Sequence, residues 1–202
     1  MKHLLLFALC SSFFAASAQA AFVYSGLQNI AIPTDVGGVG VFIDIDNGST
    51  AFADFAGADI NPFFGGSGFI NNAAFQPART STATDSAIIR LPSGALISSA
   101  LNYATGINES GGLNNHMGSG ASEFFPGSEG FLGFTFTKND SSGPFYGWVR
   151  VVFTNNTAGG VIKDWVYDDS GAPILAGAPE PTRSLLALLG LSALLQRRKR
   201  DA

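Results

Sequence analysis

The chain has 202 residues, of which 46% are hydrophobic and only 13% are charged, and its formal net charge at pH 7 is −4. Residues 21–178 carry five basic residues against thirteen acidic ones, a charge of −8. This balance argues against nucleic acid as a partner, because phosphate binding needs clustered bases. The single cysteine, Cys10, lies in the range 1–20, so the rest of the chain offers no thiol for catalysis, disulfides or zinc.

The N-terminal segment, 1–20, has the layout of a secretory signal peptide. Lys2 precedes an apolar run over residues 4–16, and Ala18 and Ala20 form an A-x-A cleavage site. This order predicts that an export translocon and signal peptidase handle the chain, and that the mature protein begins at Ala21. The alternative is a buried N-terminal helix.

Residues 21–175 are predicted to form one all-β domain, a β-sandwich of jelly-roll-like type, because short apolar runs alternate with turn residues. We expect a signal-peptide helix before this domain and a C-terminal hydrophobic sorting helix after it. The best strands are residues 41–45, 87–91, 131–137, 145–153 and 160–167. Residues 154–159 read as a hairpin loop, so the last two strands should pair antiparallel.

The strand at residues 145–153 has two distinct faces. Side chains on one face are all apolar and should point into the core: Phe145, Val149, Val151 and Phe153. The other face carries Tyr146, Trp148, Arg150 and Val152 and is expected to be wetter. On the next strand, Val161, Lys163, Trp165 and Tyr167 should alternate with Ile162, Asp164 and Val166.

Residues 106–130 are rich in Gly, Asn and Ser and predict long surface loops. They contain His116, the only histidine after the signal peptide. A nucleophile–His–acid triad is formally possible, but the sequence has no G-x-S-x-G element, and an exposed loop histidine is the simpler interpretation. We therefore assign no catalytic residues and expect the protein not to be an enzyme.

Two patterns suggest weak binding sites. Asp44, Asp46 and Asp54 lie near a turn at Asn47 and Gly48, which invites comparison with a calcium loop. The later ligands of such a loop are missing, so a solvated strand end and turn is the default, and no cofactor is assigned. Trp148 and Trp165 could form a sugar-stacking platform, although strand tryptophans more often pack in a core.

The C-terminal residues 176–202 form a three-part tail. Pro179, Glu180 and Pro181 precede twelve uncharged residues, 184–195, and the bases Arg197, Arg198, Lys199 and Arg200 follow. As a helix the uncharged run would be about 18 Å long, against roughly 30 Å of bilayer hydrocarbon, so it is a marginal anchor. The bases should remain cytoplasmic while the domain is outside.

This tail resembles the PEP-CTERM sorting domain of Gram-negative bacteria. The resemblance is confined to the tail and implies handling by an exosortase-type membrane protease and an association with exopolysaccharide and biofilm matrix. An unprocessed single-pass anchor is the alternative. Residues 146–150, 164–167 and 174–177 also resemble passengers that often precede such tails, which implies a secreted all-β domain without a known activity.

These observations lead to three ranked hypotheses. The first is an exported, non-enzymatic protein of the cell surface or extracellular matrix, anchored in the membrane until its tail is processed. The second is a carbohydrate-binding β-sandwich, with extracellular polysaccharide as its ligand and Ca²⁺ or tryptophan contacts. The third is a secreted hydrolase.

Overall fold

The computed structural model describes residues 22–34, 40–83, 86–103 and 123–178. The predicted signal peptide, His116 and the tail from Pro179 onward lie outside these residues. The described elements are β1 (Phe22–Tyr24), β2 (Ile30–Ala31), β3 (Phe42–Ile43), β4 (Thr50–Ala51), β5 (Ile60–Phe63), the 3-10 turn η1 (Phe64–Gly66), β6 (Gly68–Asn71), β7 (Phe75–Arg79), β8 (Arg90–Leu91), β9 (Leu96–Ile97), β10 (Asn102–Tyr103), β11 (Glu129–Phe136), β12 (Phe145–Val152), β13 (Val161–Asp168) and β14 (Ile174–Leu175).

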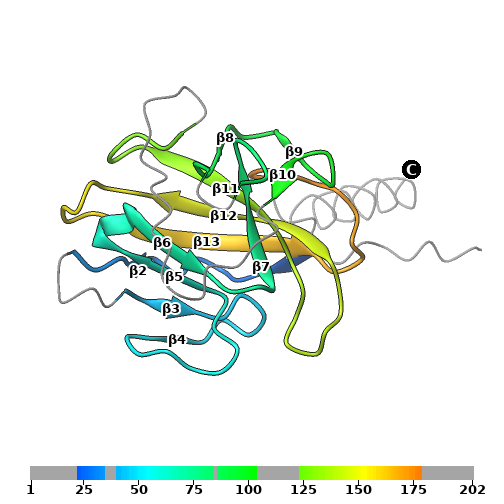
Figure 1. Ribbon diagram of the computed structural model, residues 1–202, viewed down its shortest axis with the longest axis horizontal. Helices are drawn as coiled ribbons and strands as arrows, with labels where there is room; N and C mark the ends of the chain where they lie inside the picture. Colours follow the sequence, from blue (N-terminus) through cyan, green and yellow to red (C-terminus); the bar gives the residue numbers. More distant parts are fainter. Residues whose placement is uncertain (1–21, 35–39, 84–85, 104–122, 179–202) are drawn as a thin grey trace, which may run out of the picture.

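The prediction of an all-β chain is confirmed for the described residues, whose strands all pair antiparallel. A large sheet has the order β1-β13-β12-β11-β7-β10, with β2 added beside β13 and β8 beside β11. A four-stranded sheet has the order β4-β3-β5-β6, and β14 pairs with β9. Figure 1 shows β11, β12 and β13 crossing the middle of the molecule, with β3 and β4 below them and β8 and β9 above.

The five strands predicted from the sequence correspond to observed strands. Residues 131–137, 145–153 and 160–167 match β11, β12 and β13, while residues 41–45 and 87–91 contain the shorter β3 and β8. β12 and β13 pair antiparallel across the connection that contains residues 154–159, as expected. Long alternating strands were therefore easier to recognise than two-residue strands.

The main core lies between the large sheet and the four-stranded sheet. It contains Ile43, Ile60 and Phe69 from the smaller sheet and Val149 and Val151 from β12, all buried. Phe145 and Phe153 belong to the same core, so the predicted apolar face of β12 is confirmed. Burial of these apolar side chains away from water stabilises the folded domain.

The opposite face of the large sheet is also covered, which corrects the expectation of a wet face on β12. Trp148 and Val166 pack with Ile97 of β9 and Ile174 of β14 in a second buried cluster. Trp148 is only 4% exposed. The short β9–β14 pair and its flanking loops cover this face of the sheet. The alternation of residues within β12 does not reveal which other segments pack against it.

The strict alternation predicted for β13 is also wrong. The register of the β12–β13 pair shifts between Arg150 and Val151, as in a β-bulge. Ile162, Trp165 and Tyr167 consequently all lie in the main core. In a regular strand Ile162 and Trp165, which are three residues apart, would point to opposite faces. A bulge inserts one extra residue and thereby reverses the faces of the residues that follow it.

Candidate functional site

The predicted calcium ligands do not form a set of three. Asp44 and Asp46 lie in the connection between β3 and β4, where the Asp44 carboxylate is 1% exposed. Asp54 is an exposed residue after β4. Among the described residues, no three His, Cys, Asp or Glu side chains are grouped so that they could hold a metal ion.

The carboxylate of Asp44 already accepts hydrogen bonds from the protein. The backbone N–H and side-chain amide of Asn47 donate at 3.1 and 2.9 Å, and the side-chain amide of Asn139 donates at 3.0 Å. The backbone N–H of Asn139 donates to Asp46 at 2.6 Å. Asn139 follows β11, so these bonds hold the β11–β12 connection against the β3–β4 turn.

Asp59 is the third acid near this turn and is not among the site residues predicted from the sequence. Its side chain is 3% exposed and accepts a hydrogen bond of 2.8 Å from the backbone N–H of Ile45. Burial raises the pKa of Asp59 to about 7, and the nearby charges of Asp44 and Asp46 add to the increase. Asp59 is an isolated acid just before β5, and no local pattern would have identified it.

A hollow of about 460 Å³ lies beside Asp59 on the four-stranded sheet. Three of its polar side chains, Asp59, Asn71 and Asn72, are bound to the protein itself, whereas the buried Oδ1 of Asn61 has no hydrogen-bond partner among the described residues. Asn71 donates to the carbonyl of Phe75 at 2.7 Å, and Asn72 donates to that of Ala58 at 2.8 Å. Asn72 also accepts from the N–H of Phe75 at 2.9 Å. These side chains fasten loops, which leaves them little capacity for a ligand.

The tryptophan platform proposed from the sequence is not present. Trp165 is 2% exposed, and its indole N–H donates to the carbonyl of Ile45 at 3.1 Å, which ties β13 to the β3–β4 turn. Trp148 is buried against Phe131, with ring centroids 5.1 Å apart and nearly perpendicular planes. Neither ring offers an open face to a sugar.

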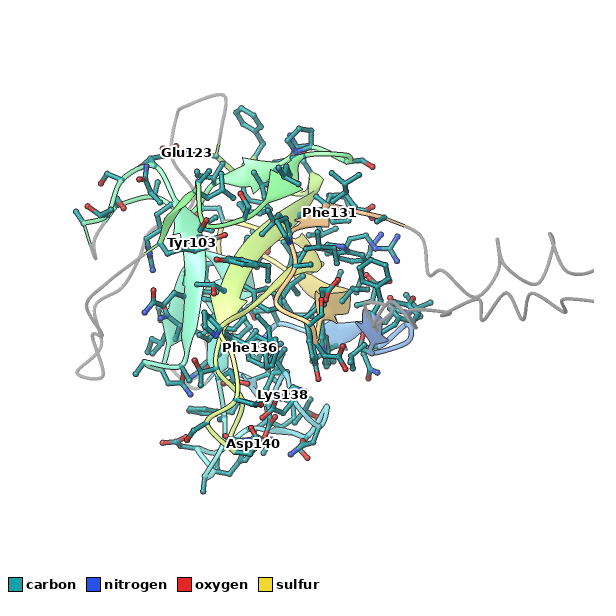
Figure 2. The ribbon with its side chains drawn as sticks, turned by 90° about the vertical axis from the view of Figure 1, so that its right-hand side faces the viewer. Tyr103, Glu123, Phe131, Phe136, Lys138 and Asp140 are labelled. Carbon is teal, nitrogen blue, oxygen red and sulfur yellow. The ribbon has the colours of Figure 1, made fainter. Side chains whose placement is uncertain are left out.

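Two tyrosines, by contrast, line a hollow on the surface. Tyr103 ends β10 and Tyr146 lies in β12; their ring centroids are 6.3 Å apart at an interplanar angle of 38°. They line a hollow of about 300 Å³ together with Ala73, Ala74, Gln76, Ser99, Thr135, Phe136, Thr137 and Pro144. Figure 2 labels Tyr103 and Phe136 on this side of the molecule, with Lys138 and Asp140 further along the β11–β12 connection.

Sheet register explains why these side chains share one face. Gln76 lies opposite Thr135, and Thr135 lies opposite Tyr146, so the three form a row across β7, β11 and β12. Tyr103 lies opposite Ala78, which is on the same face of β7 as Gln76. The Tyr103 hydroxyl donates to the carbonyl of Ser98 at 3.0 Å, and burial raises the pKa of Tyr103 above its usual value.

No helix in the described part of the chain is long and apolar enough to cross a membrane. Comparisons with known protein families, with curated proteins and with solved structures find no match to the chain.

Proposed function

We propose that the protein is an exported, non-enzymatic component of the cell surface or extracellular matrix, sorted by its C-terminal tail. The observation that carries the proposal is that the strand pairings at both ends of the domain lie between the two signals. Phe22 begins β1 and lies opposite Asp168 of β13, just after the predicted cleavage at Ala20. The Ala178 N–H donates to the carbonyl of Leu175 at 3.0 Å, directly before Pro179.

This arrangement suits a passenger between two removable segments. A signal peptide that is cut off cannot supply a strand to the fold, and a sorting tail that is read at a membrane must be accessible. β1 and β14 are both paired strands, and Ala178 lies in the turn that follows β14. Cleavage on either side would therefore leave the sheet pairings and the two buried clusters intact.

The tail supplies the sorting hypothesis. Pro179 and Pro181 favour an extended backbone around Glu180, the short apolar run gives a weak anchor, and Arg197, Arg198, Lys199 and Arg200 remain on the cytoplasmic side. The resemblance to PEP-CTERM tails adds an exosortase-type membrane protease as the partner. The protein would be exported across the inner membrane, held there transiently, and then released to the surface or an exopolysaccharide matrix.

The finer features of the proposed architecture stay predictions. A jelly-roll topology would be one form of the antiparallel two-sheet arrangement. The two flanking helices, for the signal peptide and the sorting tail, fall outside the described residues.

Mass spectrometry of the exported protein tests the proposal. We expect an N-terminus near Ala21 and no peptide from residue 185 onward. Replacing Pro179, Glu180 and Pro181 together by alanine should retain the intact chain in the membrane fraction, whereas Thr182→Ala should be processed normally. Recovery of Arg197, Arg198, Lys199 and Arg200 on the mature extracellular form would overturn the sorting hypothesis.

A further inference from the structure

The hollow between Tyr103 and Tyr146 combines aromatic and uncharged polar side chains. Two half-buried aromatic rings stand beside an amide and two hydroxyl groups, from Gln76, Thr135 and Thr137. Among the described residues, no acidic or basic side chain lines it. Its volume of about 300 Å³ falls at the small end of the range of ligand pockets.

The Tyr103 hydroxyl is bound to the carbonyl of Ser98, but four other polar side chains of this hollow are not used by the fold. Within the described part of the chain, the side chains of Gln76, Thr135 and Thr137 form no hydrogen bond, and the Tyr146 hydroxyl forms none either. The larger hollow beside Asp59 differs, because Asp59, Asn71 and Asn72 bind the protein's own backbone. A ligand in the tyrosine hollow would find donors and acceptors that form no hydrogen bond within the described part of the protein.

Rigid supports hold the two rings. Tyr146 belongs to β12, which pairs on both sides with the long strands β11 and β13. Tyr103 is fixed by the hydrogen bond from its hydroxyl to Ser98 and by the pairing of β10 with β7. Binding at such a site requires little ordering of the protein, which lowers the entropic cost of association.

We propose that this hollow is a binding site for a neutral hexopyranose unit of a polysaccharide. The pyranose ring has an apolar C–H face that packs on an aromatic ring and an edge of hydroxyl groups that both donate and accept hydrogen bonds. Tyr146 and Tyr103 provide the apolar wall, and Gln76, Thr135 and Thr137 provide the polar partners. Because the lining is uncharged and residues 21–178 carry a formal charge of −8, an anionic ligand is disfavoured.

The site does not depend on the sorting tail, since all of its residues lie in paired strands or their connections. Binding and tail processing are thus separate properties. A chain that binds sugar but keeps its tail would contradict only the proposed sorting, and a processed chain that binds none would contradict only this site.

Isothermal titration of the full chain tests the proposal with maltohexaose, cellohexaose and the hexamer of N-acetylglucosamine as neutral probes and hexagalacturonate as the charged one. We expect saturable binding of at least one neutral hexamer and weaker binding of hexagalacturonate. Tyr146→Ala should weaken the neutral interaction by about tenfold or more, as truncation of an aromatic anchor does. Tyr146→Phe retains the ring and should bind within a few-fold of the parent.

Phe52→Ala is the matched control, because Phe52 is an aromatic residue that is 68% exposed and does not line the hollow. It should bind like the parent. Thermal melting of each variant separates loss of the site from loss of the fold. Absence of binding to all neutral hexamers, preference for hexagalacturonate, or parent-like affinity in folded Tyr146→Ala would each overturn the proposal.

Discussion

The guanidinium of Arg150 forms a two-pronged ion pair with the carboxylate of Asp164 on the neighbouring strand. The Arg150 Nε donates to Asp164 Oδ1 at 2.9 Å, and one terminal nitrogen donates to Oδ2. The Tyr24 hydroxyl also donates to Oδ2, at 3.1 Å. The Asp164 side chain is only 2% exposed, against 30% for Arg150, so the arginine neutralises a buried charge. Alternation along β12 had placed Arg150 on the face expected to be wetter.

We predict that Arg150→Ser lowers the free energy of unfolding by about 3 kcal/mol, because removing one partner leaves a buried carboxylate uncompensated. A position on a wetter face would by itself predict only a mild effect. Urea denaturation monitored by circular dichroism measures the change. Asp164→Asn in the Arg150→Ser background should recover part of the loss.

Lys163→Ser is the control for this prediction. Lys163 pairs with Glu129, and their side chains are 30% and 41% exposed. An ion pair this exposed contributes about 1 kcal/mol or less. Equal destabilisation by Arg150→Ser and Lys163→Ser would contradict the claim that Arg150 stabilises the fold by compensating the buried charge of Asp164.

Val151→Asp tests the main core. Val151 is fully buried in the core between the large sheet and the four-stranded sheet, beside Val149 and Phe153. A carboxylate there has no partner, so we expect a loss of several kcal/mol, comparable to the entire stability of a typical domain. Far-UV circular dichroism should show an unfolded or strongly destabilised chain. Val152→Asp, on the half-buried side of the same strand, should remain folded.

Asp59 should make stability depend on pH. Its pKa is about 7 in the folded protein, against an unfolded value of 3.8, so between these pH values the folded state binds more protons. The contribution of Asp59 to the free energy of unfolding is fully present below pH 3.8 and is lost as the pH rises to about 7. At roughly 1.4 kcal/mol per pKa unit, the loss should reach a few kcal/mol.

Denaturation of the parent and of Asp59→Asn between pH 4 and pH 8 checks this dependence. In Asp59→Asn, the free energy of unfolding should decrease much less as the pH rises. A small decrease with pH should remain, because burial also raises the pKa of Asp46. Asp140→Asn is the control, since Asp140 is exposed and hydrogen bonds from Ser142 lower its pKa. An unchanged slope in Asp59→Asn would contradict the assignment.

The acids near the β3–β4 turn should not confer calcium sensitivity. Calcium at 100 times its dissociation constant would add about 2.7 kcal/mol, which a melting curve detects easily. We expect the melting temperature in excess calcium and in excess chelator to be the same, because Asn47 and Asn139 already satisfy Asp44. A clear increase with calcium that Asp46→Asn abolishes would restore the metal hypothesis.

Asn139→Ala tests the structural role assigned to the same turn. It removes the side-chain donor to buried Asp44, and the expected cost is about 1–2 kcal/mol, measured by urea denaturation. Asn155→Ala, at an exposed position in the β12–β13 connection, should change stability little. Similar stability in both variants would mean that the Asn139 contact does not fasten the two connections together.

The sequence by itself determined the all-β class, the long strands β11, β12 and β13, and the core face of β12. These features are local: period-two alternation along a long strand repeats one signal several times, and β12 and β13 follow each other across one short connection. Shorter or irregular strands lacked such repetition. β7 contains Pro77, which has no backbone N–H to donate, and still pairs with β11. On its other side β7 pairs with β10 only through Ala78 and Arg79, so no residue of β10 lies opposite Pro77.

Only the tertiary structure decided which polar residues are buried, paired or available. Asp59, Arg150 and Tyr103 are ordinary residues in the sequence, and each acquires its role from partners elsewhere in the fold. The β-bulge opposite Arg150 brings Asp164 to its guanidinium, and the β9–β14 pair buries Trp148 on a face that alternation left open. Burial and pairing depend on which strands meet, and that information resides in the packing of the sheets rather than in any one strand.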